Sequence, residues 1–163
     1  EYDKAINDYT KTIELNPNHA DFYYNRGSLY GDLKEYGKAI DDYTKAIGLN
    51  PNNESYYNNR GILYENLKEY DKAINDYTKT IELNPNDADY YYNRGSLYDD
   101  LKEYGKAIDD YYEAIKLDRG LLRFYENLDT VFNKLIEACP EKEKEYKHKI
   151  QEIANLKDNK ITI

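Results

Sequence analysis

The sequence predicts an all-α fold built from repeated helix hairpins, and three observations support this prediction. The octapeptide YYNRGSLY occurs at residues 23–30 and again at residues 91–98. Glycine recurs at intervals of 34 residues, at Gly27, Gly61 and Gly95. Proline recurs at the same interval, at Pro17, Pro51 and Pro85. A fixed period of this length is the signature of a repeat array, in which stacked repeats share a continuous core.

The first element expected is half a repeat, at residues 1–19. Residues 1–18 are identical to residues 69–86, which are expected to hold the second helix of a later repeat. The first helix of this hairpin is therefore expected upstream, which would make the chain part of a longer array. Apolar residues recur along the helix at helical spacing, at Tyr2, Ile6, Tyr9 and Ile13.

Three full repeats are expected next, at residues 20–53, 54–87 and 88–121. In the first of them, Tyr23, Tyr30 and Leu33 have the spacing of one helix, and residues 36–47 have the spacing of a second. Lys34–Glu35 marks the break between the two helices. Pro51 ends the second helix because a residue before proline avoids the helical region, and Asn53 is expected to cap the next helix.

Two recurring positions inside the predicted helices require partners. A glycine within a helix costs about 1 kcal/mol relative to alanine, so we expect Gly27 to face the small residues Ala39 and Ala46 and to let the helices approach closely. Beside the glycines lie Arg26, Arg60 and Arg94, and a buried arginine needs a partner. The candidate partners, within or between repeats, are Asp8, Asp42, Asp76 and Asp110.

The last part of the chain departs from the repeat pattern. A degenerate fourth repeat is expected to supply one helix at residues 122–139. In residues 140–157, Tyr146, Ile150 and Ile153 form a narrow apolar stripe on an otherwise charged helix. Such a helix suits the end of a repeat array, because it covers the last repeat and presents a polar face to water. Residues 158–163 form a tail to which no element is assigned.

Seven positions of the first full repeat follow a known pattern. They are Tyr23, Arg26, Gly27, Tyr30, Ala39, Tyr43 and Pro51. They fit W-x₂-L-G-x₂-Y, A-x₃-F and P over 34 residues, with the tryptophan, leucine and phenylalanine replaced, so the chain resembles the tetratricopeptide-repeat family over residues 1–135. The resemblance implies a right-handed α-solenoid of 34-residue helix–turn–helix repeats with a C-terminal capping helix, as one domain over residues 1–163. It also implies a concave groove lined by the first helices.

Asparagine recurs at one place in the predicted first helices, at Asn25, Asn59, Asn93 and Asn127. This resembles the asparagine ladder with which some members of the family grip an extended peptide, because an amide can pair with both polar groups of a peptide unit. Residues one turn away are expected on the same face. The predicted peptide-binding residues are Asp21, Tyr24, Asn25, Ser28, Asn58, Asn59, Ile62, Asp89, Tyr92, Asn93, Ser96 and Asn127.

Composition and motifs argue against several classes of function. The net charge of −9 disfavours binding to nucleic-acid phosphates, and no apolar run approaches the roughly 18 residues of a membrane-spanning helix. No catalytic or phosphate-binding motif occurs, and neither His19 nor His148 has neighbours at metal-ligand spacing. We therefore expect no enzyme activity, cofactor, metal, nucleic-acid partner or membrane partner. The single Cys139 excludes an internal disulfide and does not fix the compartment.

The function expected is that of a non-enzymatic scaffold that binds an extended, neutral-to-basic segment of a partner protein in the groove. Acidic residues among the predicted contacts favour a segment with lysine or arginine. The groove lacks the basic set with which some members of the family clamp a C-terminal carboxylate. Two alternatives stay open. The array could position substrates as an accessory segment of a larger enzyme, or it could self-assemble through the half repeat at residues 1–19.

Overall fold

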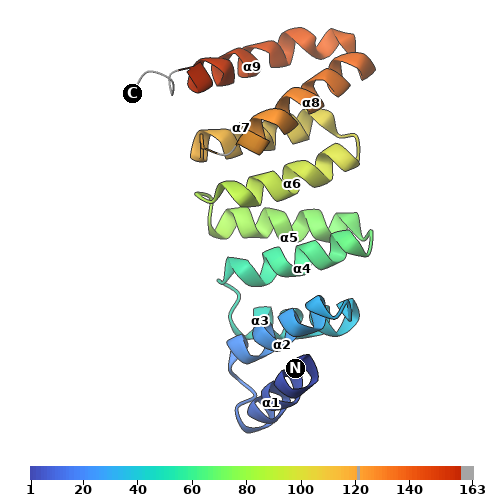
Figure 1. Cartoon of the computed structure of the whole chain (residues 1–163), viewed down its shortest axis with the longest axis vertical. Coiled ribbons are helices and arrows are strands. Elements are labelled where there is room, and N and C mark those ends of the chain that lie inside the picture. The colour runs from blue at the N-terminus through green and yellow to red at the C-terminus, as the bar shows by residue number, and fades with distance from the viewer. Residues whose placement is uncertain (121, 159–163) are drawn as a thin grey trace. The chain divides into compact units, whose positions relative to one another are not determined.

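All elements of the described chain, residues 1–120 and 122–158, are helices in the computed structural model (Figure 1). This confirms the all-α fold class. Leu121 and residues 159–163, which make up most of the predicted tail, lie outside the described residues. The elements are α1 (Tyr2–Leu15), α2 (Ala20–Asp32), α3 (Tyr36–Leu49), α4 (Glu54–Asn66), α5 (Tyr70–Leu83), α6 (Ala88–Asp100), α7 (Tyr104–Leu117), α8 (Leu122–Ala138), the 3₁₀ helix η1 (Pro140–Lys142) and α9 (Glu143–Asp158).

The chain divides into two compact units, Glu1–Pro85 and Asn86–Ile163. The first unit contains α1 to α5, and the second contains α6 to α9. Within the units, α2 packs against α3, α4 against α5 and α6 against α7, so each full repeat forms a helix hairpin. The single solenoid domain over residues 1–163 stays a prediction.

Each hairpin turns at a lysine with left-handed backbone. Lys34, Lys68 and Lys102 have φ values of 60°, 60° and 61°. After α2, the N–H of Lys34 donates to the carbonyl of Gly31 and the N–H of Glu35 donates to that of Tyr30, both at 2.9 Å. These two bonds form a Schellman motif, which satisfies carbonyls that the end of a helix leaves unpaired. The break predicted at Lys34–Glu35 is confirmed, and the same pair of bonds follows α4 and α6.

The glycine inside a first helix lies against a tyrosine ring, not against the alanines expected. A Cβ atom on Gly27 would lie 3.0 Å from two carbons of the Tyr43 ring and 3.2 Å from Cβ of Asp42. The prediction that Gly27 faces Ala39 and Ala46 is therefore wrong. The ring of Tyr43 occupies the space that the absent side chain leaves, whereas Ala39 and Ala46 are buried in two separate apolar clusters.

The second unit ends with α8 and α9, which close its apolar core. Fully buried side chains on α8 are Phe124, Leu128 and Val131. On α9, Ile153 is 4% exposed and belongs to the same cluster. An ion pair between Lys149 of α9 and Asp109 of α7 lies beside it. The apolar stripe predicted for the last helix thus packs on the helices that precede it.

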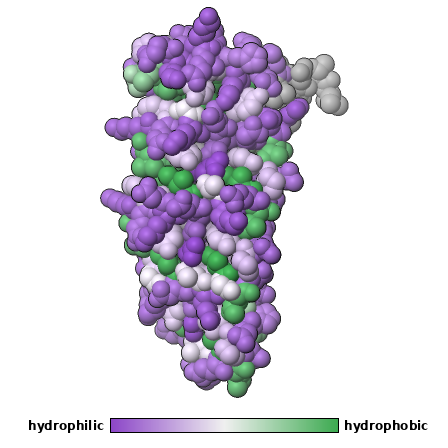
Figure 2. Space-filling model, turned by 180° about the vertical axis from the view of Figure 1, so that it is seen from behind, coloured by the Kyte–Doolittle hydropathy of each residue, from purple (hydrophilic) through white to green (hydrophobic). Residues whose placement is uncertain are grey.

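The surface of the described residues is mainly polar on the face that Figure 2 shows. Hydrophilic residues predominate there, and hydrophobic residues form separate patches between them. Scattered apolar residues of this kind are normal for a protein surface. A binding site is therefore better sought where polar and apolar groups line a hollow together.

Candidate functional site

A hollow of about 280 Å³ lies in the first unit, and we call it the α2–α4 hollow. Three of the predicted peptide-binding residues line it together: Ser28 of α2, and Asn59 and Ile62 of α4. Asp32, which is exposed, and Asn66 add polar groups at its edge. The other lining residues are Gly31, Tyr36, Tyr43 and Leu63. Hydrogen-bonding and apolar groups thus converge at one place.

Asn59 and Tyr24 contact one another beside this hollow. The side-chain N–H of Asn59 donates to the hydroxyl of Tyr24 at 3.0 Å. The Tyr24 ring packs against the rings of Tyr43 and Tyr56, with centroid distances of 5.6 and 5.0 Å. The contacts of Tyr24 with Asn59 and Tyr56 join two neighbouring repeats. Because an asparagine amide carries two donors and an acceptor, Asn59 keeps capacity for a further bond.

Asp21, a predicted groove residue, accepts a hydrogen bond from the next repeat. The hydroxyl of Tyr56 donates to its carboxylate at 2.5 Å. Burial of the phenol, and then this bond, raise the pKa of Tyr56 to about 12. Tyr56 lies 35 residues along the chain from Asp21, and no motif within either repeat indicated the pair.

The second unit repeats the asparagine–tyrosine contact. The amide of Asn127 donates to the hydroxyl of Tyr92 at 3.1 Å. Arg123 lies over the Tyr92 ring at 4.9 Å from its centroid and forms an ion pair with Asp89. Tyr92 and Asn127 thus make the same contact as Tyr24 and Asn59 do in the first unit, whereas Asp89 pairs with an arginine and Asp21 with a tyrosine hydroxyl. Asn25, Asn58, Asn93 and Ser96 also lie on the first helices of their repeats.

An ion pair in the second unit occupies the positions that border the α2–α4 hollow in the first. Asp99 and Lys134 stand two repeats after Gly31 and Asn66. Nζ of Lys134 donates to both carboxylate oxygens of Asp99 at 2.8 Å. Where the first unit has a glycine and an asparagine, the second has a lysine folded onto a carboxylate. The difference between copies at position 31 therefore changes the chemistry of this surface.

The recurring arginines pair within their own repeats. Arg26 donates to both carboxylate oxygens of Asp42, from Nε at 2.8 Å and from Nη2 at 2.7 Å. Arg60 makes the same two bonds to Asp76, and Arg94 makes them to Asp110. The bond to Asp42 raises the pKa of the Arg26 guanidinium. This geometry answers the question that the sequence left open, and it supports a structural role for the arginines.

The acidic partner in the third full repeat, Asp110, is itself buried. Burial raises the pKa of the Asp110 carboxyl, and the Arg94 guanidinium opposes that shift. The exposed fraction of Asp110 is 5%. A buried bidentate pair of this kind is costly to break, because removing one partner leaves the other charge buried and unpaired.

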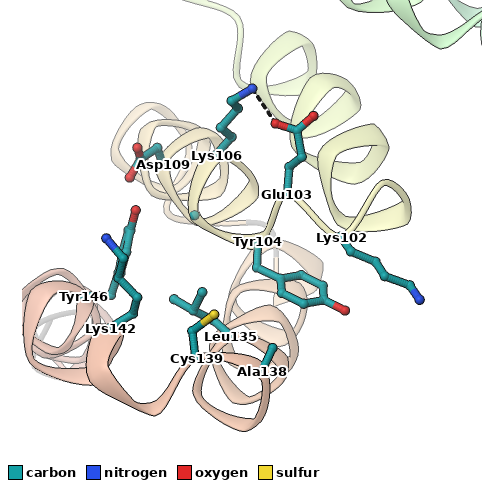
Figure 3. A pocket seen from close by; sticks show the side chains of 11 residues that line it. Lys102, Glu103, Tyr104, Lys106, Asp109, Leu135, Ala138, Cys139, Lys142 and Tyr146 are labelled. Carbon is teal, nitrogen blue, oxygen red and sulfur yellow. Dashed lines mark ion pairs between the residues drawn. The ribbon is translucent and has the colours of Figure 1, made fainter.

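Sequence reasoning missed a larger hollow in the second unit, of about 710 Å³ (Figure 3). Leu135 and Ala138 of α8 and the next residue, Cys139, lie on one side of it, and Tyr104 lies on another. The rim carries charged groups, including the ion pair between Lys106 and Glu103. Only the tertiary structure brings the α6–α7 turn, the end of α8 and the start of α9 together, so no local pattern could have indicated this hollow.

Other classes of site are not seen in the described residues. No group of three or more histidine, cysteine or acidic side chains among them could hold a metal ion. Among the same residues, no helix has the length and hydropathy needed to cross a bilayer.

The chain belongs to the tetratricopeptide-repeat family. The family model described as tetratricopeptide repeat matches residues 20–53, 55–87 and 88–121. A second model, described as TPR repeat, matches residues 1–34. The two models together cover more than half of the chain and confirm the family that the sequence pattern indicated. Proteins of this family are in general non-enzymatic scaffolds for protein–protein interaction. A comparison with curated proteins finds no match.

Solved structures with the same fold cover most of the chain. The crystal structure of MamA protein is similar with a TM-score of 0.78 and 26% identity, over 97% of this chain and 85% of that one. The first TPR of Spaghetti (RPAP3), bound to the HSP90 peptide SRMEEVD, has a TM-score of 0.67 and 27% identity, over 71% and 92%. The Arabidopsis OM64 TPR domain has a TM-score of 0.66 and 25% identity, over 71% and 95%.

Proposed function

We propose that the first unit binds an extended, neutral-to-basic segment of a partner protein, and that the α2–α4 hollow receives one of its side chains. The observation that carries this proposal is the hollow itself, in which Ser28, Asn59 and Ile62 come together. Preformed pockets with a few convergent polar groups are the usual places for ligands. Because the hollow is already formed, binding does not have to order this surface.

A lysine or arginine fits the hollow best. Its aliphatic stem would pack on Ile62 and Leu63, and its charged head would reach the exposed carboxylate of Asp32. None of the described residues that line the hollow is a lysine or an arginine. In the second unit a lysine lies on the corresponding surface, because Lys134, at the position of Asn66, places its ammonium on Asp99, at the position of Gly31.

The peptide held by the Spaghetti structure has a different chemistry. Its sequence is SRMEEVD, and three of its last four residues are acidic. An acidic tail of that kind would meet Asp32 at the α2–α4 hollow without a basic residue to receive it. We therefore propose the same general activity, peptide binding, with the opposite preference for charge.

The asparagines are proposed to hold the backbone of the segment. Asn59 donates one N–H to Tyr24 and accepts at its oxygen from Asn58 at 3.4 Å, and the second lone pair of that oxygen can serve a peptide N–H. Asn25 holds the same position in α2. Such bonds give affinity with little choice of sequence, so the hollow would supply the specificity.

A double variant tests the proposal by copying the second unit into the first. Gly31→Asp with Asn66→Lys should place an ion pair across the α2–α4 hollow, as Asp99 and Lys134 do. The change should fit, because a Cβ atom on Gly31 would meet only Leu63 Cδ2, at 3.8 Å. We expect peptides selected from a random library to be rich in lysine and arginine, and to bind the double variant at least about tenfold more weakly, which is about 1.4 kcal/mol.

The reciprocal variant is the matched control. Asp99→Gly with Lys134→Asn alters the second unit and should leave the affinity of the same peptides unchanged. Thermal unfolding of both variants checks that the fold is kept. Equal affinity for the unaltered chain and the Gly31→Asp, Asn66→Lys variant would exclude the hollow as the site. Selection of acidic peptides would contradict the proposed charge preference.

A further inference from the structure

The hollow beside Cys139 forms because α8 is longer than the first helices of the full repeats. Helices α2, α4 and α6 each have 13 residues, whereas α8 has 17, four more. Four residues add about 6 Å of helix, at about 1.5 Å per residue. Leu135 and Ala138 belong to this extra turn, and both line the hollow. The extra turn separates the start of α9 from the start of α7, and the hollow lies between them (Figure 3).

Apolar and aromatic side chains form the walls of this hollow, which we call the Cys139 hollow. Leu135, Ala138 and Cys139 lie on one side, and Tyr104 and Tyr146 also line it (Figure 3). Both tyrosines and the cysteine are only half-buried, so the hollow is open to solvent. Its volume of about 710 Å³ lies in the usual range of ligand sites, about 300 to 1,000 Å³. An open hollow of this size can receive a side chain of a partner whose backbone stays outside.

The wall at Tyr146 depends on the glycine at the start of α7. A Cβ atom on Gly105 would lie 2.7 Å from the hydroxyl oxygen of Tyr146. No described atom lies within 4 Å of a Cβ atom on Gly37, which holds the equivalent position in the first unit. The missing side chain at Gly105 thus leaves the room in which the tyrosine of α9 lies. This wall is a feature of the second unit and does not recur with the repeat.

The charged groups around the Cys139 hollow leave one lysine without a carboxylate partner. Glu103 is paired with Lys106, and Asp109 is paired with Lys149. Lys102 is exposed, lines the hollow and forms no ion pair with any described residue. The acidic groups that line the hollow are therefore neutralised, whereas the ammonium of Lys102 is not. A carboxylate on the occupant would complement this charge.

We propose that the Cys139 hollow binds a segment of a partner protein in which an aromatic residue is followed by an acidic one. The aromatic ring would pack on Leu135 and Ala138 and contact the tyrosine rings in the walls, because offset aromatic contacts add to the burial of apolar area. The acidic side chain would pair with Lys102. This site lies in the second unit, so the inference does not rest on the function proposed for the first.

A basic segment fits the Cys139 hollow less well. Glu103 and Asp109 already hold lysines, so a further cation would have to displace one of them. It would also meet the ammonium of Lys102, and like charges placed together disfavour an interface. The expected preference for charge is thus opposite to that of the α2–α4 hollow.

Disulfide tethering tests the proposal, because Cys139 is the single cysteine of the chain. Three probes, Ac-Phe-Glu, Ac-Phe-Lys and Ac-Ala-Glu, are each extended by cysteamine and joined through a disulfide to 2-mercaptoethanol. The thiolate of Cys139 attacks the cysteamine sulfur and 2-mercaptoethanol leaves, so one disulfide replaces another without net oxidation. Intact-mass spectrometry in excess 2-mercaptoethanol gives the exchange constants. We expect the constant of the Phe-Glu probe to be at least about tenfold larger than the other two.

Variants of the chain locate the site. Lys102→Glu should remove the preference for the Phe-Glu probe over the Phe-Lys probe. Lys34→Glu is the matched control and should keep it, since Lys34 has the same left-handed backbone in the first unit. The double variant Cys139→Ser, Asn133→Cys moves the thiol to an exposed position of α8 outside the hollow, and it should bind the three probes equally. Circular dichroism checks that each variant keeps its helices.

Several outcomes would overturn the proposal. They include equal constants for the three probes, a preference for the Phe-Lys probe, and equal effects of Lys102→Glu and Lys34→Glu. The chain itself has an exposed aromatic–acidic pair, Tyr2–Asp3. Alkylation of Cys139 by iodoacetamide that slows as the chain concentration rises, unless Tyr2→Ala is present, would assign the hollow to a second copy. Protection by free phenylacetate equal to that by Ac-Phe-Glu-NH₂ would assign it to a small aromatic acid.

Discussion

Single glycines in the helices differ in effect according to what lies over them. A Cβ atom on Gly61 would lie 3.0 Å from Cε1 of the Tyr77 ring, and that ring is 1% exposed. Nothing lies within 4 Å of a Cβ atom on Gly48. Both residues are helical, so alanine improves the intrinsic helix propensity of both.

Gly61→Ala should therefore destabilise the protein, whereas Gly48→Ala should stabilise it. The added methyl group at position 61 must displace a packed ring, which costs about 1 to 3 kcal/mol. At position 48 the gain is up to about 1 kcal/mol. Urea unfolding followed by circular dichroism measures both changes in the free energy of unfolding. A stabilising effect of Gly61→Ala would show that the ring moves aside at little cost.

Tyr56 makes the stability of the fold depend on pH in the alkaline range. Burial and the bond to Asp21 raise the pKa of its phenol to about 12 in the folded chain. In the unfolded chain a tyrosine has a pKa of about 10. The stabilisation from neutral Tyr56 is thus fully present below about pH 10 and is lost as the pH rises toward 12.

Asp21→Asn should reduce this pH dependence. The variant loses the bond to the carboxylate, so it is less stable at neutral pH, and the pKa of Tyr56 falls toward its ordinary value. We expect the free energies of unfolding of the variant and the unaltered chain to converge between about pH 9 and 12. Asp41→Asn, at an exposed site on α3, is the control and should give a parallel curve. A constant difference for Asp21→Asn would contradict the coupling.

At the scale of the helix hairpin, the turn holds strain that the sequence pattern does not reveal. Lys34, Lys68 and Lys102 occupy the left-handed position that follows each first helix. Glycine is the usual residue there, because a side chain in this conformation costs about 1 to 2 kcal/mol. The Schellman bonds hold the lysines in place despite that cost.

Lys68→Gly should accordingly raise the free energy of unfolding by about 1 kcal/mol, after allowance for the greater freedom of glycine in the unfolded chain. Lys45→Gly is the control, because Lys45 is exposed within α3 and glycine there should cost about 1 kcal/mol. Both changes remove a lysine, so the effect of net charge cancels in the comparison. Loss of stability in both variants would show that the turn does not strain the lysine.

The sequence predicts the helices well and their contacts less well. Periodicity and proline place helix ends within the repeat, as at Asn50 and the Lys34–Glu35 break, because these signals are local. The partner of Gly27 was predicted wrongly, since spacing says which residues share a face but not where a large ring lies. The bond of Asn59 to Tyr24 joins residues 35 apart and depends on how repeats stack. Such contacts are fixed by tertiary packing, and a local sequence pattern does not predict them.

Part of the proposed site could likewise be predicted from the sequence, and part could not. Ser28, Asn59 and Ile62 could be placed on one surface from the sequence, because they recur on one face of the first helices. That Asp21 and Asp89 already have partners could not be predicted, since those partners lie on the following repeat. The hollow beside Cys139 could not be predicted either, because it is made where the repeat pattern ends.

At the scale of the whole molecule, stability should be distributed unevenly, as in repeat proteins generally. Amide hydrogen exchange in α1 and α5 can be compared directly, because identical sequences have the same intrinsic exchange rates. Any difference between the two helices then measures a difference in local stability. Tyr77 and Thr80 are buried in α5, whereas their equivalents in α1, Tyr9 and Thr12, are only half-buried. We expect α1 to exchange faster than α5.

Peptides cut from residues 2–15 and 70–83 have the same mass, so mass spectrometry should show two isotope envelopes for one sequence. Lys11→Arg, at an exposed site, adds mass to the copy from α1 and assigns the fast envelope. A single envelope would mean that α1 is as protected as α5 without a covering helix.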